Sequence, residues 1–153
     1  MDDFSKQKII YPDIMRMPKN PDLLDAYPYF YLDAKGYYIE ATNFMLTGKE
    51  LESIFSFFIS DIGFYAFSKF YSGPQFDATG FRYKKEYMNN FYVPILNQQD
   101  TNILKSCLSH NNFDINKIDI TIDEIYSRSI GLEKIEIETI KAYKRSLLLE
   151  GMR

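Results

Sequence analysis

The chain has 153 residues, 46% hydrophobic and 25% charged, which is the composition of one folded domain rather than of a disordered chain. One cysteine and one histidine exclude an internal disulfide and argue against a zinc site built from these residue types. The net charge of −3 excludes a general attraction to nucleic acids, so any DNA contact must rest on a local basic patch or a basic partner domain.

Neither a secretion signal nor a membrane span is expected. Residues 1–3 are acidic where a signal peptide would be basic and then apolar. The longest apolar run is interrupted by Ser56, Ser60, Asp61 and Gly63, so it is too short to cross a membrane. Because the only cysteine also fits a reducing compartment, we expect a cytoplasmic protein with no membrane partner.

The N-terminal third is predicted to form short strands. The segments are rich in β-branched and aromatic residues, and they are Lys8–Tyr11, Tyr29–Leu32, Tyr37–Glu40 and Asn43–Leu46. Asp33–Gly36 has the composition of a tight turn and predicts a hairpin between the second and third of them.

A long aromatic helix is predicted over Thr47–Lys69. Thr47 and Glu50 have the spacing of a capping box, and apolar residues then recur at helical spacing. Phe57, Phe64 and Phe67 lie on the remaining faces, so the helix is apolar nearly all round. The plain interpretation is a core helix buried from several sides, and the alternative is that one face packed on a neighbouring domain.

The second half of the chain is predicted to be mostly helical. Phe81–Lys84 is expected to be extended, and Glu86–Phe91 and Gln98–Ser109 to be helices. A second capping-box spacing at Thr121 and Glu124 predicts the start of a further helix. Gly131 interrupts it, and a last helix runs over Glu133–Glu150, with its acidic residues early and its basic residues late, as the helix dipole favours.

Taken together, these elements predict an α+β fold. We expect a small, mostly antiparallel sheet packed on the Thr47–Lys69 helix, followed by a C-terminal helical extension. Residues 1–96 would form the body, and residues 97–153 an extension of the same domain.

No familiar catalytic motif is present. The chain lacks a nucleophile elbow, a phosphate-binding glycine-rich loop and a dinucleotide fingerprint. His110 follows a predicted helix beside two asparagines, which favours capping or solvent contact over catalysis. Cys107 lies on an apolar helical face and is interpreted as a small buried hydrophobe. We therefore predict no catalytic and no metal-binding residue.

One basic segment is locally unusual. Between Lys69 and Tyr92 the chain has four basic and two acidic residues, interleaved with aromatics and small loop residues. Lysine and arginine bind phosphates, while arginine and glutamine can read guanine and adenine. The candidate DNA-binding residues are Lys69, Tyr71, Ser72, Gln75, Arg82, Lys84 and Lys85. The alternative is an amphipathic strand, with Phe81 and Tyr83 inside and Arg82 and Lys84 outside, that has no function of its own.

The order of several short motifs resembles a known family. These motifs are Lys8–Tyr11, Phe44–Gly48, Phe70–Gly73, Gly80–Tyr87 and Val93–Ile95. In this order they resemble the TaqI-like C-terminal specificity domain of adenine-specific DNA methyltransferases and of fused restriction-modification enzymes. The resemblance covers roughly residues 8–145 and rests on the order and spacing of degenerate motifs.

The resemblance implies a target-recognition domain of a bacterial restriction-modification protein, with double-stranded DNA as its partner. In that family an N-terminal catalytic domain binds S-adenosylmethionine and methylates adenine, and fused enzymes also cleave DNA. Asn20–Leu23 lacks the second proline and the aromatic residue of that domain's catalytic motif. We therefore expect no cofactor in this chain, and the parent's catalytic domain as a second partner.

Two other functions fit the same residues. The chain would be a protein-interaction or assembly module with no DNA contact if its aromatic helix and helical extension mediate association. It would be a small enzyme if a deep pocket gathered titratable side chains that the sequence does not bring together.

Overall fold

The computed structural model describes residues 5–38, 42–72, 80–109 and 113–151. Strands β3 (Tyr31–Asp33), β1 (Lys8–Pro12) and β4 (Asn43–Leu46) form an antiparallel sheet in that order. A second antiparallel sheet pairs β2 (Ile14–Arg16) with β5 (Gly80–Arg82).

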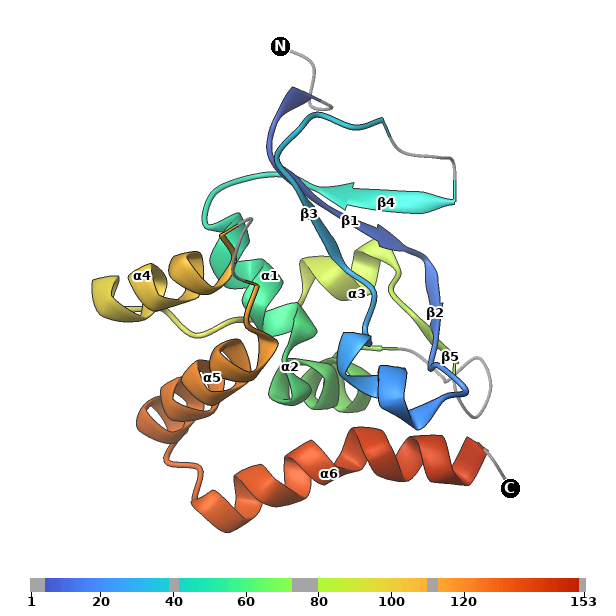
Figure 1. The fold of residues 1–153 in the computed structure, drawn as a ribbon, viewed down its shortest axis with the longest axis vertical. Coiled ribbons are helices and arrows are strands. Elements are labelled where there is room, and N and C mark those ends of the chain that lie inside the picture. Colours follow the sequence, from blue (N-terminus) through green and yellow to red (C-terminus); the bar gives the residue numbers. More distant parts are fainter. Residues whose placement is uncertain (1–4, 39–41, 73–79, 110–112, 152–153) are drawn as a thin grey trace.

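The remaining elements are helical. They are the 3-10 helix η2 (Pro21–Ala26), α1 (Leu51–Ile59), α2 (Asp61–Ala66), the π-helical turn η3 (Phe67–Tyr71), α3 (Lys85–Asn89), α4 (Gln98–Cys107), α5 (Ile115–Ile130) and α6 (Lys134–Gly151). Figure 1 shows the larger sheet at one end of the molecule, α1 and α2 in the middle and α6 across the opposite end. The fold is α+β, with a small antiparallel sheet packed against helices, as the sequence predicted.

The larger sheet contains two of the predicted strands almost unchanged. β1 and β4 lie where Lys8–Tyr11 and Asn43–Leu46 were predicted, and β3 lies at Tyr31–Asp33, slightly after Tyr29–Leu32. Ile9 of β1 is opposite Leu32 on one side and Leu46 on the other, and it is fully buried. The sheet therefore holds its apolar face against the helices.

The predicted hairpin after β3 is wrong. Tyr37 and Tyr38 are not part of a strand, and residues 39–40 lie outside the described residues. The Asp33 carboxylate accepts hydrogen bonds from the backbone N–H groups of Lys35 and Tyr37, at 2.8 and 2.9 Å. This local bonding gives the backbone an alternative to a second strand.

The predicted helix over Thr47–Lys69 is broken in two. α1 starts only after Glu50, which has φ 56° and makes no side-chain cap hydrogen bond, so the predicted capping box is wrong. Ser60 ends α1 with an extended backbone and caps α2, its Oγ accepting from the N–H of Gly63 at 3.0 Å. A serine that can cap a helix therefore divides a segment whose apolar pattern is continuous.

The broken helix is nevertheless the centre of the core. Phe57, Phe64 and Phe67 point in different directions and are each at most 1% exposed, as the plain interpretation of a buried helix predicts. The surrounding core draws on every part of the chain, including Met15, Tyr27, Phe81, Tyr83, Leu104, Cys107, Ile118, Ile122 and Leu148. Cys107 is a buried free thiol, as predicted.

The C-terminal helices follow the prediction with one correction. α5 begins at Ile115, where the Asp114 side chain accepts from the N–H of Lys117. Thr121 lies inside α5 and donates to the Lys117 carbonyl, so the second predicted capping box is wrong. Gly131, at φ 72°, ends the helix in the left-handed conformation that favours glycine, and α6 follows as predicted.

In the part of the chain that the structure describes, no helix is both long enough and apolar enough to span a bilayer.

Candidate nucleic-acid interface

The β2–β5 ribbon has one apolar and one basic face. Met15 is opposite Phe81, and the two side chains are 1% and 2% exposed. Tyr83 continues the apolar face, because its ring stacks on Phe67 with centroids 4.2 Å apart and its N–H donates to the Asp13 carbonyl. Since side chains alternate along a strand, Arg82 and Lys84 lie on the other face.

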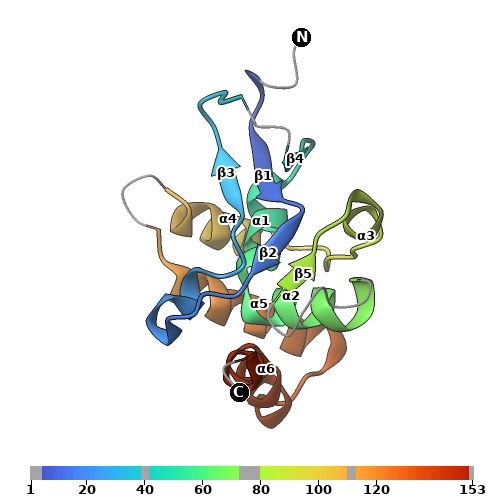
Figure 2. The same ribbon diagram turned by 90° about the vertical axis from the view of Figure 1, so that its right-hand side faces the viewer.

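The ribbon brings a further basic residue to this face, one that the sequence did not single out. Arg16 is opposite Gly80, and Arg82 is opposite Ile14, so both arginines project from the same face as diagonal neighbours. Figure 2 shows β2 and β5 side by side with α3 next to them. We define the basic face as Arg16, Arg82, Lys84 and Lys85.

The side chains of the basic face are accessible to different degrees. Arg16 and Lys85 are exposed, whereas Arg82 and Lys84 are half-buried. Lys84 precedes the first turn of α3, with its Nζ atom 5.8 Å from the centre of the Tyr87 ring, and Lys85 is the first residue of that helix. The acidic neighbours in sequence are Asp13, which is half-buried, and Glu86, which is exposed. Lysine and arginine side chains of this kind are suited to contact with phosphate groups.

Two of the other predicted site residues lie at the end of the turn η3: Tyr71 is its last residue, and Ser72 follows it. The Tyr71 ring packs against Phe91 at 4.9 Å between centroids, and Ser72 donates to the Ser68 carbonyl at 3.1 Å. The stack of Phe67 on Tyr83 holds η3 beside β5. Tyr71 and Ser72 are therefore attached to the same part of the fold as the basic face.

Lys69 and Gln75 do not join this group. The Lys69 ammonium lies over the Tyr143 ring of α6, 4.6 Å from its centre, so this charge is engaged with the C-terminal helix. Gln75 lies outside the described residues, as does His110.

Arg16 had a weak signal in the sequence. The run Ile14-Met15-Arg16 alternates as a strand does, and Met15 in its middle is buried in the structure, but the segment was not predicted as a strand. The pairing with β5 is a contact between segments more than sixty residues apart, and no local pattern encodes it.

A second charged cluster lies elsewhere and joins α2, α5 and α6. Lys144 is only 5% exposed, and its Nζ contacts Asp61 Oδ1 at 2.6 Å and the Tyr27 carbonyl at 3.0 Å. Asp119 accepts from the N–H of Asp61 at 2.9 Å, and Lys141 bonds Asp123 at 2.7 Å. These bonds attach α6 to the core, so we interpret the cluster as structural.

Asp119 makes this cluster sensitive to pH. Burial and the neighbouring Asp61 carboxylate raise the pKa of Asp119 from 3.8 to about 6. The folded protein therefore holds this proton more tightly than the unfolded chain, and stability falls as pH rises through the window between these two values.

We expect the free energy of unfolding to fall by about 1 kcal/mol between pH 5 and pH 7, and Asp119→Asn to remove most of this slope. The asparagine retains an oxygen that can accept from the N–H of Asp61 but cannot ionise. Urea denaturation across the pH range measures the slope, and Asp22→Asn, at an exposed carboxylate in η2, is the matched control. Equal slopes in wild type and Asp119→Asn would contradict this role.

No group of three or more histidine, cysteine, aspartate or glutamate side chains among the described residues has the arrangement of a metal site. Comparison of the chain with protein-family models, curated protein sequences and solved structures returned no match. The TaqI-like resemblance therefore stays a prediction that rests on the order of short motifs.

Proposed function

We propose that the chain is a DNA sequence-recognition domain that positions a duplex for a catalytic methyltransferase domain. The observation that carries this proposal is the basic face of an acidic chain: Arg16 and Arg82 project from one face of the ribbon, and Lys84 and Lys85 follow shortly after β5. On the other face of the ribbon, Met15, Phe81 and Tyr83 are buried in the aromatic core. This packing fixes the position of the backbone that carries the basic side chains.

The geometry supports phosphate contact by the basic face, with Tyr71 and Ser72 attached to the same part of the fold. Lysine and arginine side chains at the edge of a fixed ribbon orient a duplex, while side chains on adjacent loops reach base edges. Tyr71 and Ser72 lie at the end of η3, directly before residues 73–79, and β5 follows that segment. The proposal includes three further points. The partner domain depends on S-adenosylmethionine, it methylates adenine, and the protein is cytoplasmic.

The isolated chain is expected to bind duplex DNA weakly and with strong salt dependence. With four phosphate-binding side chains, the slope of log K against log salt concentration is expected to be about −3 to −4. Fluorescence anisotropy with a labelled 20-base-pair duplex, titrated at several salt concentrations, measures this slope. Sub-micromolar, sequence-specific binding at physiological salt would show that the chain needs no basic partner domain.

Charge reversal tests which surface is responsible. We expect Arg82→Glu with Lys84→Glu to reduce the low-salt affinity for duplex at least 30-fold, because two phosphate contacts become repulsive. In a protein containing the catalytic domain, the same change is expected to abolish DNA methylation. Lys117→Glu with Lys134→Glu alters the net charge equally at exposed positions of α5 and α6 and is the matched control.

The control variant is expected to retain most of the affinity, and far-ultraviolet circular dichroism checks that both double variants are folded. Equal losses in the two variants would mean that only net charge matters. Unchanged DNA activity in the Arg82→Glu, Lys84→Glu variant would favour the assembly-module function instead.

A further inference from the structure

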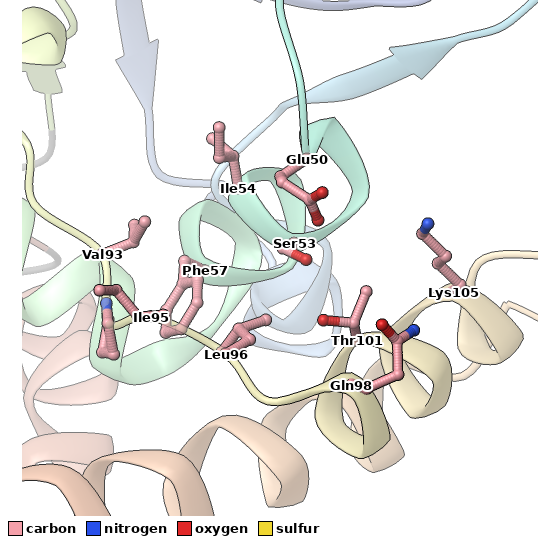
Figure 3. A pocket seen from close by; sticks show the side chains of 11 residues that line it. Glu50, Ser53, Ile54, Phe57, Val93, Ile95, Leu96, Gln98, Thr101 and Lys105 are labelled. Carbon is pink, nitrogen blue, oxygen red and sulfur yellow. The ribbon is translucent and has the colours of Figure 1, made fainter.

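A groove separate from the basic face lies between α1, α4 and the segment that joins α3 to α4. Its volume is about 470 Å³, within the range of about 300–1,000 Å³ typical of ligand sites. The apolar walls come from Ile54 and Phe57 of α1 and from residues 93–96 (Figure 3). Glu50, Ser53, Gln98, Thr101 and Lys105 add polar groups.

The buried Ser53 hydroxyl has no partner inside the protein. Ser53 is 5% exposed, and its Oγ forms no hydrogen bond with any described residue. A serine in a helix usually bonds the carbonyl one turn before it, as Ser56 does with Glu52 at 2.7 Å. Figure 3 shows the Ser53 hydroxyl directed into the space between α1 and α4, toward Thr101. Most buried polar groups in proteins have a hydrogen-bond partner, so the Ser53 hydroxyl is an unused donor beside the groove.

The segment beside the groove has unpaired backbone. Residues 92–96 belong to no helix or strand, and their N–H and C=O groups form no hydrogen bond to any other described residue. Val93 precedes a proline, which favours an extended backbone. Tyr92 and Ile95 are 82% and 99% exposed, so the segment also presents apolar side chains to solvent.

Unpaired backbone next to an apolar groove is the arrangement used in peptide recognition by strand addition. The partner's main chain bonds the open backbone, and one bulky side chain enters the groove. Two charged residues, Glu50 and Lys105, lie on the same side of the groove, and no ion pair links them to other described residues (Figure 3). A partner that carries charges of both signs next to its apolar side chain would complement them.

We propose that this groove binds an extended peptide segment of a partner protein through a bulky aliphatic or aromatic side chain. The peptide backbone pairs with residues 92–96, and one of its carbonyls accepts from the Ser53 hydroxyl. A basic peptide residue lies toward Glu50 and an acidic one toward Lys105. This proposal does not depend on DNA recognition, because no residue of the basic face lines the groove.

The probe is a set of N-acetylated, C-amidated nonapeptide pools, with leucine, phenylalanine, aspartate or lysine fixed at the centre and the other positions randomised without proline. Affinity selection on the full 153-residue chain is expected to retain the leucine and phenylalanine pools and to reject the charged ones. Equal retention of all four pools, or retention of none, would overturn the proposal.

Substitutions in the groove test whether the selected peptides bind there. We expect Thr101→Trp to fill the groove and weaken a selected peptide at least 10-fold, and Ser53→Ala to weaken it about 3- to 10-fold by removing one hydrogen bond. Ser53→Ala is expected to leave the melting temperature unchanged or raise it, because the hydroxyl has no partner in the free protein. Ile130→Trp, at a position 67% exposed at the end of α5, is the control and should bind normally.

N-methylation of the peptide tests strand pairing without changing the protein. Peptides that each carry one N-methyl group are compared. Strand addition predicts that the N-methyl group lowers affinity at every second position and has no effect on affinity at the positions between them. Lys105→Glu should shift the flanking preference from acidic to basic residues, and Arg82→Glu with Lys84→Glu should leave peptide affinity unchanged. An equal effect of N-methylation at every position would contradict strand pairing and overturn the proposal. Concentration-dependent dimers of the chain that Thr101→Trp abolishes would assign the groove to a second copy of the chain and would also overturn it.

Discussion

Gly63→Ala is expected to lower the free energy of unfolding by at least 3 kcal/mol, which is among the largest effects of any single substitution. A Cβ atom at this position would lie 1.6 Å from the carbonyl oxygen of Phe57 and 2.7 Å from its carbonyl carbon. Both are backbone atoms, so no change of rotamer can relieve the overlap. The end of α1 and the first turn of α2 would have to separate.

That separation would also remove the cap of α2. The Ser60 Oγ accepts from the N–H of Gly63 and donates to the Phe57 carbonyl at 2.8 Å, so all three residues share one tight turn. Loss of a serine cap alone costs about 1 kcal/mol. Since Phe57 and Phe64 lie on either side of this turn in the aromatic core, a shift of the turn would also disturb their packing.

Urea and thermal unfolding, followed by circular dichroism, measure the effect, and a loss of 3 kcal/mol corresponds to a fall in melting temperature of about 6–12 °C. Gly131→Ala is the matched control. Gly131 has φ 72°, but no described atom lies within 4 Å of the position that its added Cβ atom would take, so only backbone strain of about 1 kcal/mol is expected. A Gly63→Ala protein as stable as the Gly131→Ala protein would refute the steric argument.

Asp33→Ala is expected to cost about 3–5 kcal/mol, because it removes the carboxylate from a buried, hydrogen-bonded ion pair. Lys8 Nζ and Asp33 Oδ2 are 2.5 Å apart, and both side chains are fully buried. The same carboxylate accepts from the N–H groups of Lys35 and Tyr37, which would lose their acceptor as well. The pair joins β1 to β3 directly, since Lys8 is opposite Asp33 in the sheet.

The pair also has a defined pH dependence. Burial by itself raises the pKa of Asp33, but the hydrogen bonds from Lys8, Lys35 and Tyr37 outweigh it and lower the pKa below its usual value. The stability that this carboxylate contributes is therefore present above the unfolded pKa of about 3.9 and is lost as pH falls through the lower folded value. Asp33→Ala should lack this acid-dependent loss.

A double-mutant cycle measures the coupling. Lys8→Met with Asp33→Asn is expected to be less damaging than the sum of the two single changes, with a coupling energy above about 2 kcal/mol. The exposed pair Lys134–Glu138, at 3.9 Å, is the control and should couple by less than about 0.5 kcal/mol. Similar coupling in both pairs would show that burial does not strengthen the Lys8–Asp33 interaction.

Gly63→Ala acts on the packing that supports both proposed surfaces. The Ser60 turn fixes α1, which forms one wall of the peptide groove, and the aromatic core between α2 and β5 supports the basic face. Gly63→Ala is therefore expected to weaken DNA and peptide binding together. The charge reversals and groove variants, in contrast, should each affect one surface only.

The sequence by itself determined the elements whose signals are local. Alternation placed Phe81 and Tyr83 inside and Arg82 and Lys84 outside, since side chains of a strand point to opposite faces. Gly131 ended one helix, and α6 followed it, because a left-handed backbone favours glycine wherever it occurs. The α+β class followed from the sequence of such segments.

Tertiary structure decided what depends on contacts between distant segments. The predicted aromatic helix ends at Ser60 and restarts as α2, and this turn requires the backbone of Gly63 to lie directly against the Phe57 carbonyl group. Arg16 joined Arg82 through strand pairing, and Ser53 came to face residues 93–96 and Thr101 across a groove. Such juxtapositions depend on how whole surfaces pack together, and no periodicity within one segment carries that information.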